Sequence, residues 1–78
     1  MGWIPVQAFS LGSTKPRAAA DCVEESAGYD GEWVTLVNRS AISGQPIKYR
    51  RRGRTVYETR KEATAAARMA IKQKIRWA

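Results

Sequence analysis

The sequence predicts an α+β domain in which a small antiparallel sheet of three or four strands packs against a long C-terminal helix, with a short helix near the N-terminus. Two patterns support this fold class. Apolar, β-rich runs alternate with Gly, Pro and Ser turn signals as far as residue 58, and an alanine-rich run with helical periodicity follows. A chain of 78 residues is long enough for only one thin core. We therefore expect residues 1–78 to form a single domain.

The first third of the chain is expected to hold an extended segment and a short helix. Residues 1–12 mix aromatic and β-branched side chains around Pro5, as an edge strand or a packed arm would. A helix is expected over 16–27, because Pro16 suits a first helical turn and Gly28 a C-terminal stop. This helix would have an acidic outer face, formed by Asp21, Glu24 and Glu25.

The middle of the chain, residues 32–58, is expected to form the main part of the sheet. Residues 32–38 are β-rich and carry apolar side chains on both faces, as a central strand does. Residues 47–52 and 54–58 flank Gly53 as the two arms of a hairpin would. The two-residue period of a strand makes one face of this hairpin basic. That face carries Lys48, Arg50 and Arg52.

A long helix is expected over 59–76. Thr59 and Glu62 match a capping box, in which the two side chains satisfy backbone amides at the helix start. Helical periodicity gives this helix a small-residue packing face, made of Ala63, Ala66, Ala67, Ala70, Ile71 and Ile75. Residues spaced by four form a basic stripe on the other side, made of Arg60, Thr64, Arg68, Lys72 and Arg76, with Lys61 near one end.

The charge of the chain is unevenly distributed. Fourteen Lys and Arg against seven Asp and Glu give a net charge of +7. Residues 1–32 hold two basic and five acidic residues, whereas residues 33–78 hold twelve basic and two acidic ones. Such asymmetry indicates a polyanionic partner, and nine of the cations are Arg, whose planar fork matches phosphate. The alternative is that the acidic stretch 21–32 neutralises part of the basic half within the fold.

Eight cations are the candidate nucleic-acid-binding residues. An arginine-rich turn would concentrate positive potential at a protruding tip. Cations at a helix start are disfavoured by the helix dipole, so helix stability alone does not explain them. The candidates are Arg50, Arg51, Arg52, Arg54, Arg60, Lys61, Arg68 and Lys72. Tyr49 and Tyr57 are candidates for stacking on unpaired bases, with a cross-strand pair that supports the hairpin as the alternative.

Residues 59–70 (TRKEATAAARMA) resemble the final-helix motif of double-stranded RNA-binding domains. The order helix, three strands, helix expected from Pro16 onward also resembles that family. There the basic residues that open the last helix grip phosphates across the major groove, a role that would fall to Arg60 and Lys61. Residues 47–67 are similar to the strand-plus-helix half of arm-type DNA-binding domains of phage-like integrases. Both resemblances imply a basic sheet edge and helix start presented to nucleic acid.

Catalysis is not expected from this sequence. It has no His, one Cys, no cluster with metal-ligand spacing and no glycine-rich phosphate loop. We therefore expect no enzyme activity, no metal and no cofactor. The lone Cys22 and the lack of a long apolar run favour a cytoplasmic protein that does not contact a membrane.

Three functions remain open at this stage. The first is a small basic module that binds DNA or RNA through phosphate contacts, with weak sequence preference. The second is a phage-encoded, anti-CRISPR-like inhibitor that binds an acidic surface of a host nucleoprotein machine. The third is an RNA-stabilised component of a larger particle. We expect the first and keep the second as its main alternative.

Overall fold

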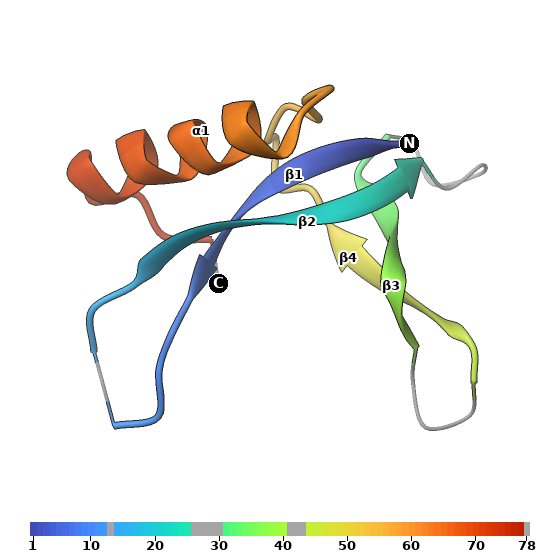
Figure 1. Cartoon of the computed structure of the whole chain (residues 1–78), viewed down its shortest axis with the longest axis horizontal. Coiled ribbons are helices and arrows are strands. Elements are labelled where there is room, and N and C mark those ends of the chain that lie inside the picture. Colours follow the sequence, from blue (N-terminus) through green and yellow to red (C-terminus); the bar gives the residue numbers. More distant parts are fainter. Residues whose placement is uncertain (13, 26–30, 41–43, 78) are drawn as a thin grey trace.

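The fold is a four-stranded antiparallel open sheet followed by one helix. It is described by a computed structural model of residues 1–12, 14–25, 31–40 and 44–77. Within these residues the elements are β1 (Gly2–Ala8), β2 (Arg17–Glu25), β3 (Trp33–Ser40), β4 (Pro46–Arg50) and α1 (Arg60–Lys72). Each strand pairs with the next one along the chain, so the sheet is a meander. Figure 1 shows α1 lying over β1 and β2, while β3 and β4 bend away on the other side.

The expected α+β class and C-terminal helix are confirmed, but the expected helix over 16–27 is wrong. Residues 17–25 form β2, which pairs with β1 along its length, from Gly2 opposite Val23 to Ala8 opposite Arg17. Alanines favour a helix locally, yet without β2 the strand β1 would expose a row of unpaired backbone groups. Tertiary pairing therefore overrides local propensity. Residues 26 and 27 of that expectation lie outside the described residues.

Two further expectations depended on the N-terminal helix. The acidic helix face is wrong, because Asp21 and Glu24 lie three residues apart in a strand and so face opposite sides of the sheet. Nothing is described of the side chain of Glu25. The order helix, three strands, helix of double-stranded RNA-binding domains is not found either, because a strand takes the place of the first helix.

The core lies on the face of the sheet that is turned away from α1. Its buried side chains come from β1, β2 and β3, and are Ile4, Val6, Val23, Val34 and Leu36. The alternate residues of β1 face the helix: Gln7 Nε2 donates to the carbonyl oxygen of Ile75 (2.6 Å), and the guanidinium of Arg60 lies 5.9 Å from the centre of the Trp3 indole. The strand expected over 32–38 is β3, and it lies between β2 and β4 as a central strand should.

The start of α1 was predicted correctly. The backbone N–H of Glu62 donates to Thr59 Oγ1 (3.2 Å), and this hydroxyl donates to Glu62 Oε1 (2.8 Å). The N-cap side chain thereby satisfies one of the free amides of the first turn. Three residues of the expected packing face are buried in the helix, namely Ala63, Ala67 and Ala70. Small side chains here let the helix lie close to the sheet.

The helix ends at Lys72 rather than near residue 76. Lys74 adopts a φ of 60°, in the left-handed region. Its N–H donates to the carbonyl oxygen of Ile71 (3.0 Å), and the N–H of Ile75 donates to that of Ala70 (2.9 Å). These two bonds form a Schellman motif, which terminates a helix. Ile75, expected on the packing face, therefore lies in the tail and is 44% exposed.

The hairpin expected around Gly53 is wrong, although the turn is present. Arg52 and Gly53 both have positive φ (54° and 74°), and the N–H of Arg54 donates to the carbonyl oxygen of Arg51 (3.1 Å), as in a type I′ turn. The chain then leaves β4 and reaches the outer edge of β1. There Tyr57 and Trp3 exchange two backbone hydrogen bonds of 2.7 Å.

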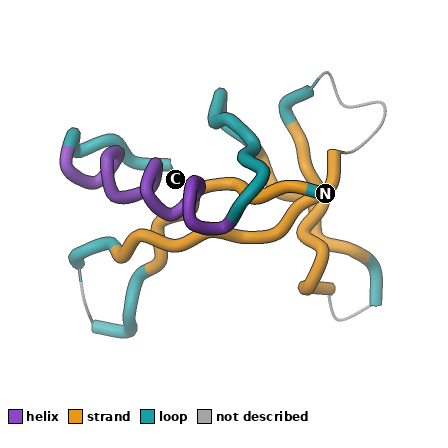
Figure 2. Tube along the Cα trace, turned by 45° about the horizontal axis from the view of Figure 1, so that its top comes forward, coloured by secondary structure: helices purple, strands orange, loops and turns teal. Residues whose placement is uncertain are grey.

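The residues after the turn therefore cover part of an exposed strand edge instead of pairing with β4. β1 is an edge strand in the order of the sheet, as expected. Pro5 is tolerated there because its missing N–H removes no hydrogen bond within the sheet. Figure 2 shows the connection between β4 and α1 rising beside the helix, with the β1–β2 and β3–β4 strand pairs extending toward opposite sides of the molecule.

Candidate functional site

The arginines of residues 50–54 do not gather at one tip, so that expectation is wrong. Arg50 and Arg52 are exposed, whereas Arg51 is half-buried and Arg54 is only 6% exposed. Arg51 donates from Nη1 to the carbonyl oxygen of Gly31 (3.0 Å). The turn reverses the chain, which directs neighbouring side chains to opposite sides. Two of the four arginine side chains are therefore exposed.

Arg54 is buried and its guanidinium is held by protein acceptors. Nε donates to the carbonyl oxygen of Arg51 (2.6 Å), and Nη2 to that of Arg50 (2.7 Å). Nη1 donates to the carbonyl oxygen of Pro5 (2.6 Å) and to the Tyr49 hydroxyl (3.3 Å). These bonds join the end of β4 to the outer edge of β1. Arg54 is therefore a structural residue, and we exclude it from the candidate binding surface.

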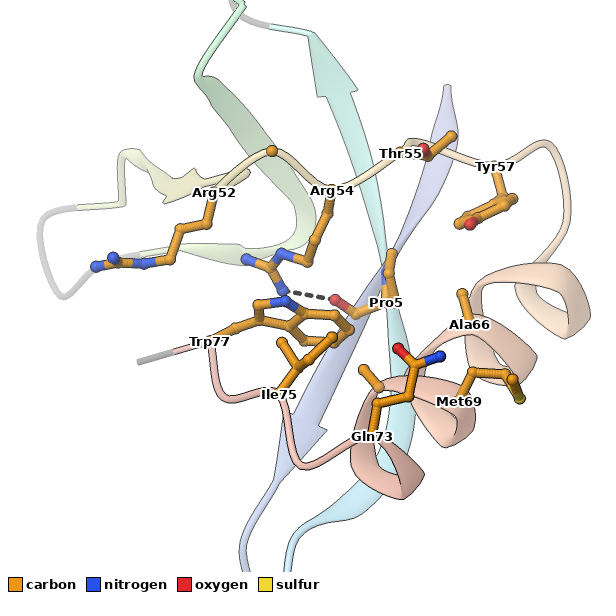
Figure 3. A pocket seen from close by; sticks show the side chains of 12 residues that line it. Pro5, Arg52, Arg54, Thr55, Tyr57, Ala66, Met69, Gln73, Ile75 and Trp77 are labelled. Atoms are coloured by element: carbon orange, nitrogen blue, oxygen red, sulfur yellow. Dashed lines mark hydrogen bonds between the residues drawn. The ribbon is translucent and has the colours of Figure 1, made fainter.

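Two aromatic rings flank the same guanidinium. The centre of the Tyr49 ring lies 4.9 Å from Arg54 Cζ, and that of the Trp77 ring lies 4.7 Å from it. Figure 3 shows Arg54 between the strand and the indole of the C-terminal tail, with its bond to Pro5. Tyr49 is half-buried and packs against the core, so it supports Arg54 rather than forming an exposed stacking surface.

The cations of α1 lie on one flank of the helix. Arg60, Lys61, Arg68 and Lys72 are all exposed, and we call these four residues the helix row. Thr64 interrupts the row, and its hydroxyl donates to the carbonyl oxygen of Arg60 (2.8 Å). At 100° per residue Met69 and Gln73 lie outside the row, roughly 105° and 145° around the helix from its middle.

A second group of cations lies on the outer face of the β3–β4 hairpin. Lys48 is paired with Thr35 and Arg50 with Trp33, on the face opposite to the buried Val34. Lys48 Nζ donates to Thr35 Oγ1 (3.0 Å), and the guanidinium of Arg50 lies 4.8 Å from the centre of the Trp33 indole. We call Lys48 and Arg50, together with Arg52 in the turn that follows β4, the ribbon face.

Trp33 was not among the residues that the sequence singled out for the surface. Val34 and Leu36 are buried, so strand alternation places Trp33 on the outer face. That alternation is the signal that could have identified it.

Within the side chains that the structure describes, the acidic residues of the first half leave the helix row, Arg50 and Arg52 without an ion pair. Glu32 Oε1 accepts the backbone N–H of Arg52 (3.1 Å) and leaves its guanidinium unbound. Glu24 is exposed on β2, opposite Thr35. Among the described residues, no carboxylate forms an ion pair with the helix row, with Arg50 or with Arg52. The helix row, Arg50 and Arg52 therefore keep their positive charge in the folded chain.

A pocket of about 440 Å³ lies on the other flank of α1. Figure 3 shows it between the helix, the C-terminal tail and the segment that follows the Arg52–Gly53 turn, with Pro5 at its base. Its remaining lining residues are Arg52, Gly53, Arg54, Thr55, Tyr57, Ala66, Met69, Ala70, Gln73, Ile75 and Trp77. None of the described residues that line it is Asp or Glu. Tyr57, a stacking candidate from the sequence, contributes to its wall.

Comparisons with known proteins assign neither a family nor a function to this chain. Neither a protein-family model, nor a curated protein, nor a solved structure matches the chain. In the part of the chain that the structure describes, no helix has the length and apolarity needed to cross a bilayer. The same residues contain no group of three His, Cys, Asp or Glu side chains placed to hold a metal ion.

Proposed function

We propose that this chain is a small nucleic-acid-binding module that contacts phosphates through the helix row and the ribbon face. The helix row carries the proposal. Four cations are exposed on one flank of a 13-residue helix, and within the described residues no carboxylate pairs with them.

Helix stability accounts for Lys72, which lies in the last turn where the helix dipole favours a cation, but not for the rest of the helix row. Like charges spaced by four residues, such as Arg68 and Lys72, cost about 0.2–0.5 kcal/mol per pair, and an interleaved Glu would remove that cost. Arg60 and Lys61 occupy the first turn, where the helix dipole disfavours cations. A bound polyanion would relieve both penalties. Each phosphate that it neutralises would also release condensed counterions, which favours binding.

The ribbon face adds a second surface with suitable chemistry. The indole of Trp33 supports the guanidinium of Arg50, which limits the conformational freedom that Arg50 would lose on binding a phosphate. A two-stranded ribbon also has dimensions that the major groove of B-DNA admits. The shape of the ribbon face therefore supports contacts to a duplex. Its charges would bind the phosphates of DNA and of RNA alike.

A salt titration of binding tests the proposal. The wild type, a helix-row variant (R60Q/K61Q/R68Q/K72Q) and a control that removes the same charge elsewhere (K15Q/R17Q/K74Q/R76Q) are titrated with duplex DNA, duplex RNA and single strands. Each lost phosphate contact should lower the slope of log K against log salt by about 0.9 on B-DNA. The helix-row variant should therefore lose more of the slope than the control, with unchanged circular dichroism.

Two results would contradict the proposal. One is the absence of binding by the wild type to every nucleic acid at low salt. The other is an equal loss in both variants, which would indicate attraction by net charge alone. If the wild type instead captures an acidic protein after nuclease treatment and the helix-row variant does not, the alternative function as an inhibitor of a host nucleoprotein machine is favoured.

A further inference from the structure

Apart from Arg52, the residues that line the pocket beside α1 take no part in the proposed phosphate contacts. Its volume of about 440 Å³ falls within the range of small-molecule sites, roughly 300–1,000 Å³. Met69 is 54% exposed and Ile75 is 44% exposed at its wall, although both side chains are apolar. A planar or apolar group that entered the pocket would cover this surface and gain from its burial.

Polar groups at the pocket are suited to the edge of a nucleobase. Thr55 and Gln73 are exposed, and their side chains make no hydrogen bond within the described part of the chain. The amide of Gln73 presents a donor and an acceptor side by side, an arrangement that matches the paired donor and acceptor of a base edge. The Tyr57 ring, labelled in Figure 3, supplies an aromatic surface at the same pocket.

The charge of the pocket favours a ligand that carries phosphate. Arg54 lies at its inner wall, and the acceptors of its guanidinium are carbonyl and hydroxyl oxygens rather than carboxylates. Arg52 lines the pocket and its side chain extends outward from it (Figure 3). Because no acidic residue lines the pocket, nothing there repels the phosphates that flank a base.

We infer that this pocket takes an unpaired nucleobase. The base would pack against Tyr57, Met69 and Ile75, with its edge at Gln73 and the adjoining phosphate near Arg52. This inference rests on the proposed function and adds a substrate class to it, because it requires a bulge, a loop or a single strand. Unpaired bases are the parts of a nucleic acid that aromatic side chains and amide groups are able to reach.

The test compares two hairpins that differ only by one unpaired adenine, each made as DNA and as RNA. Stacking and burial of one base should make the wild type bind the bulged probe about tenfold more tightly than the fully paired probe. The preference should appear in at least one of the two nucleic acids. Fluorescence anisotropy at one fixed salt concentration measures both dissociation constants.

Two charge-matched variants locate the effect. M69E places a carboxylate at the pocket, at a position exposed enough to accept it. A65E places the same charge at an exposed helix position that does not line the pocket. M69E should abolish the preference for the bulged probe, whereas A65E should weaken binding to both probes by the same factor. Q73A should reduce the preference without changing the affinity for the paired probe.

The outcomes separate this inference from the proposed function. Binding to both probes with equal affinity would overturn the inference and leave the proposed function in place. A preference that persists in M69E would overturn the assignment to this pocket. Absence of binding to all probes at low salt would overturn both.

Discussion

Replacing Arg54 by alanine should destabilise the domain more than the loss of any exposed arginine. The carbonyl oxygens of Pro5, Arg50 and Arg51 each accept a hydrogen bond of 2.6–2.7 Å from Arg54, and the substitution removes all three bonds. It also empties the space between the rings of Tyr49 and Trp77. The connection between β4 and the outer edge of β1 would lose its main polar link.

The expected magnitude is a large share of the total stability. A hydrogen bond to a charged group contributes about 1.5–3 kcal/mol, and a buried acceptor left without a donor costs about 1–3 kcal/mol. Because some of the carbonyl oxygens would rehydrate, we expect a loss of about 3–4 kcal/mol. A chain of this length has a free energy of unfolding of about 4–12 kcal/mol. The variant should therefore keep a free energy of unfolding of about 0–9 kcal/mol and unfold at a clearly lower urea concentration than the wild type.

Equilibrium urea unfolding followed by circular dichroism measures the loss. R52A is the matched control, because Arg52 is exposed and only its backbone N–H is bonded, so a change within about 0.5 kcal/mol is expected. R54K should recover less than half of the loss, since one ammonium group cannot replace a planar fork that serves three carbonyls. A loss below about 1 kcal/mol for R54A, or one equal to that of R52A, would refute the structural role.

Two further changes test the ends of α1. T59A removes the acceptor of the Glu62 N–H. It should lower the free energy of unfolding, measured by urea titration, by about 1 kcal/mol. An unchanged value would show that the cap contributes nothing. K74G relieves a left-handed backbone conformation and should raise the thermal midpoint, with a gain of about 1 kcal/mol. K74A is its control, because it removes the charge but keeps the strain; an equal gain in both would exclude the backbone explanation.

The sequence predicted elements where the signal is local. Thr59 and Glu62 lie within one turn, so the helix start could be identified from four residues. The end could not, because Lys74 takes the left-handed position that glycine usually marks. β2 was missed because its alanines favour a helix on their own, while the pairing that makes it a strand comes from residues 2–8.

In the candidate site, too, the features set by local pattern could be predicted, and those set by tertiary contacts could not. The sequence identified the cations of α1 correctly as exposed, since helical periodicity fixes which residues face the sheet. Within residues 50–54 (RRRGR), however, the sequence could not show that Arg50 is exposed and Arg54 buried. Their environments depend on the turn at Arg52–Gly53 and on the edge of β1, whose residues lie about fifty positions earlier in the chain. Burial of one arginine in five residues is therefore a tertiary property.

Geometry sets an upper limit on how many phosphates this surface can neutralise. The helix row and the ribbon face together present seven exposed cations, although the chain contains fourteen. At about 0.9 per phosphate on B-DNA, seven contacts give a salt slope near −6, and the helix row alone gives one near −4. A measured slope near −4 would mean that a duplex occupies only one surface at a time. A slope much steeper than −6 would require cations outside both surfaces, which would contradict the assignment of the interface to these seven residues.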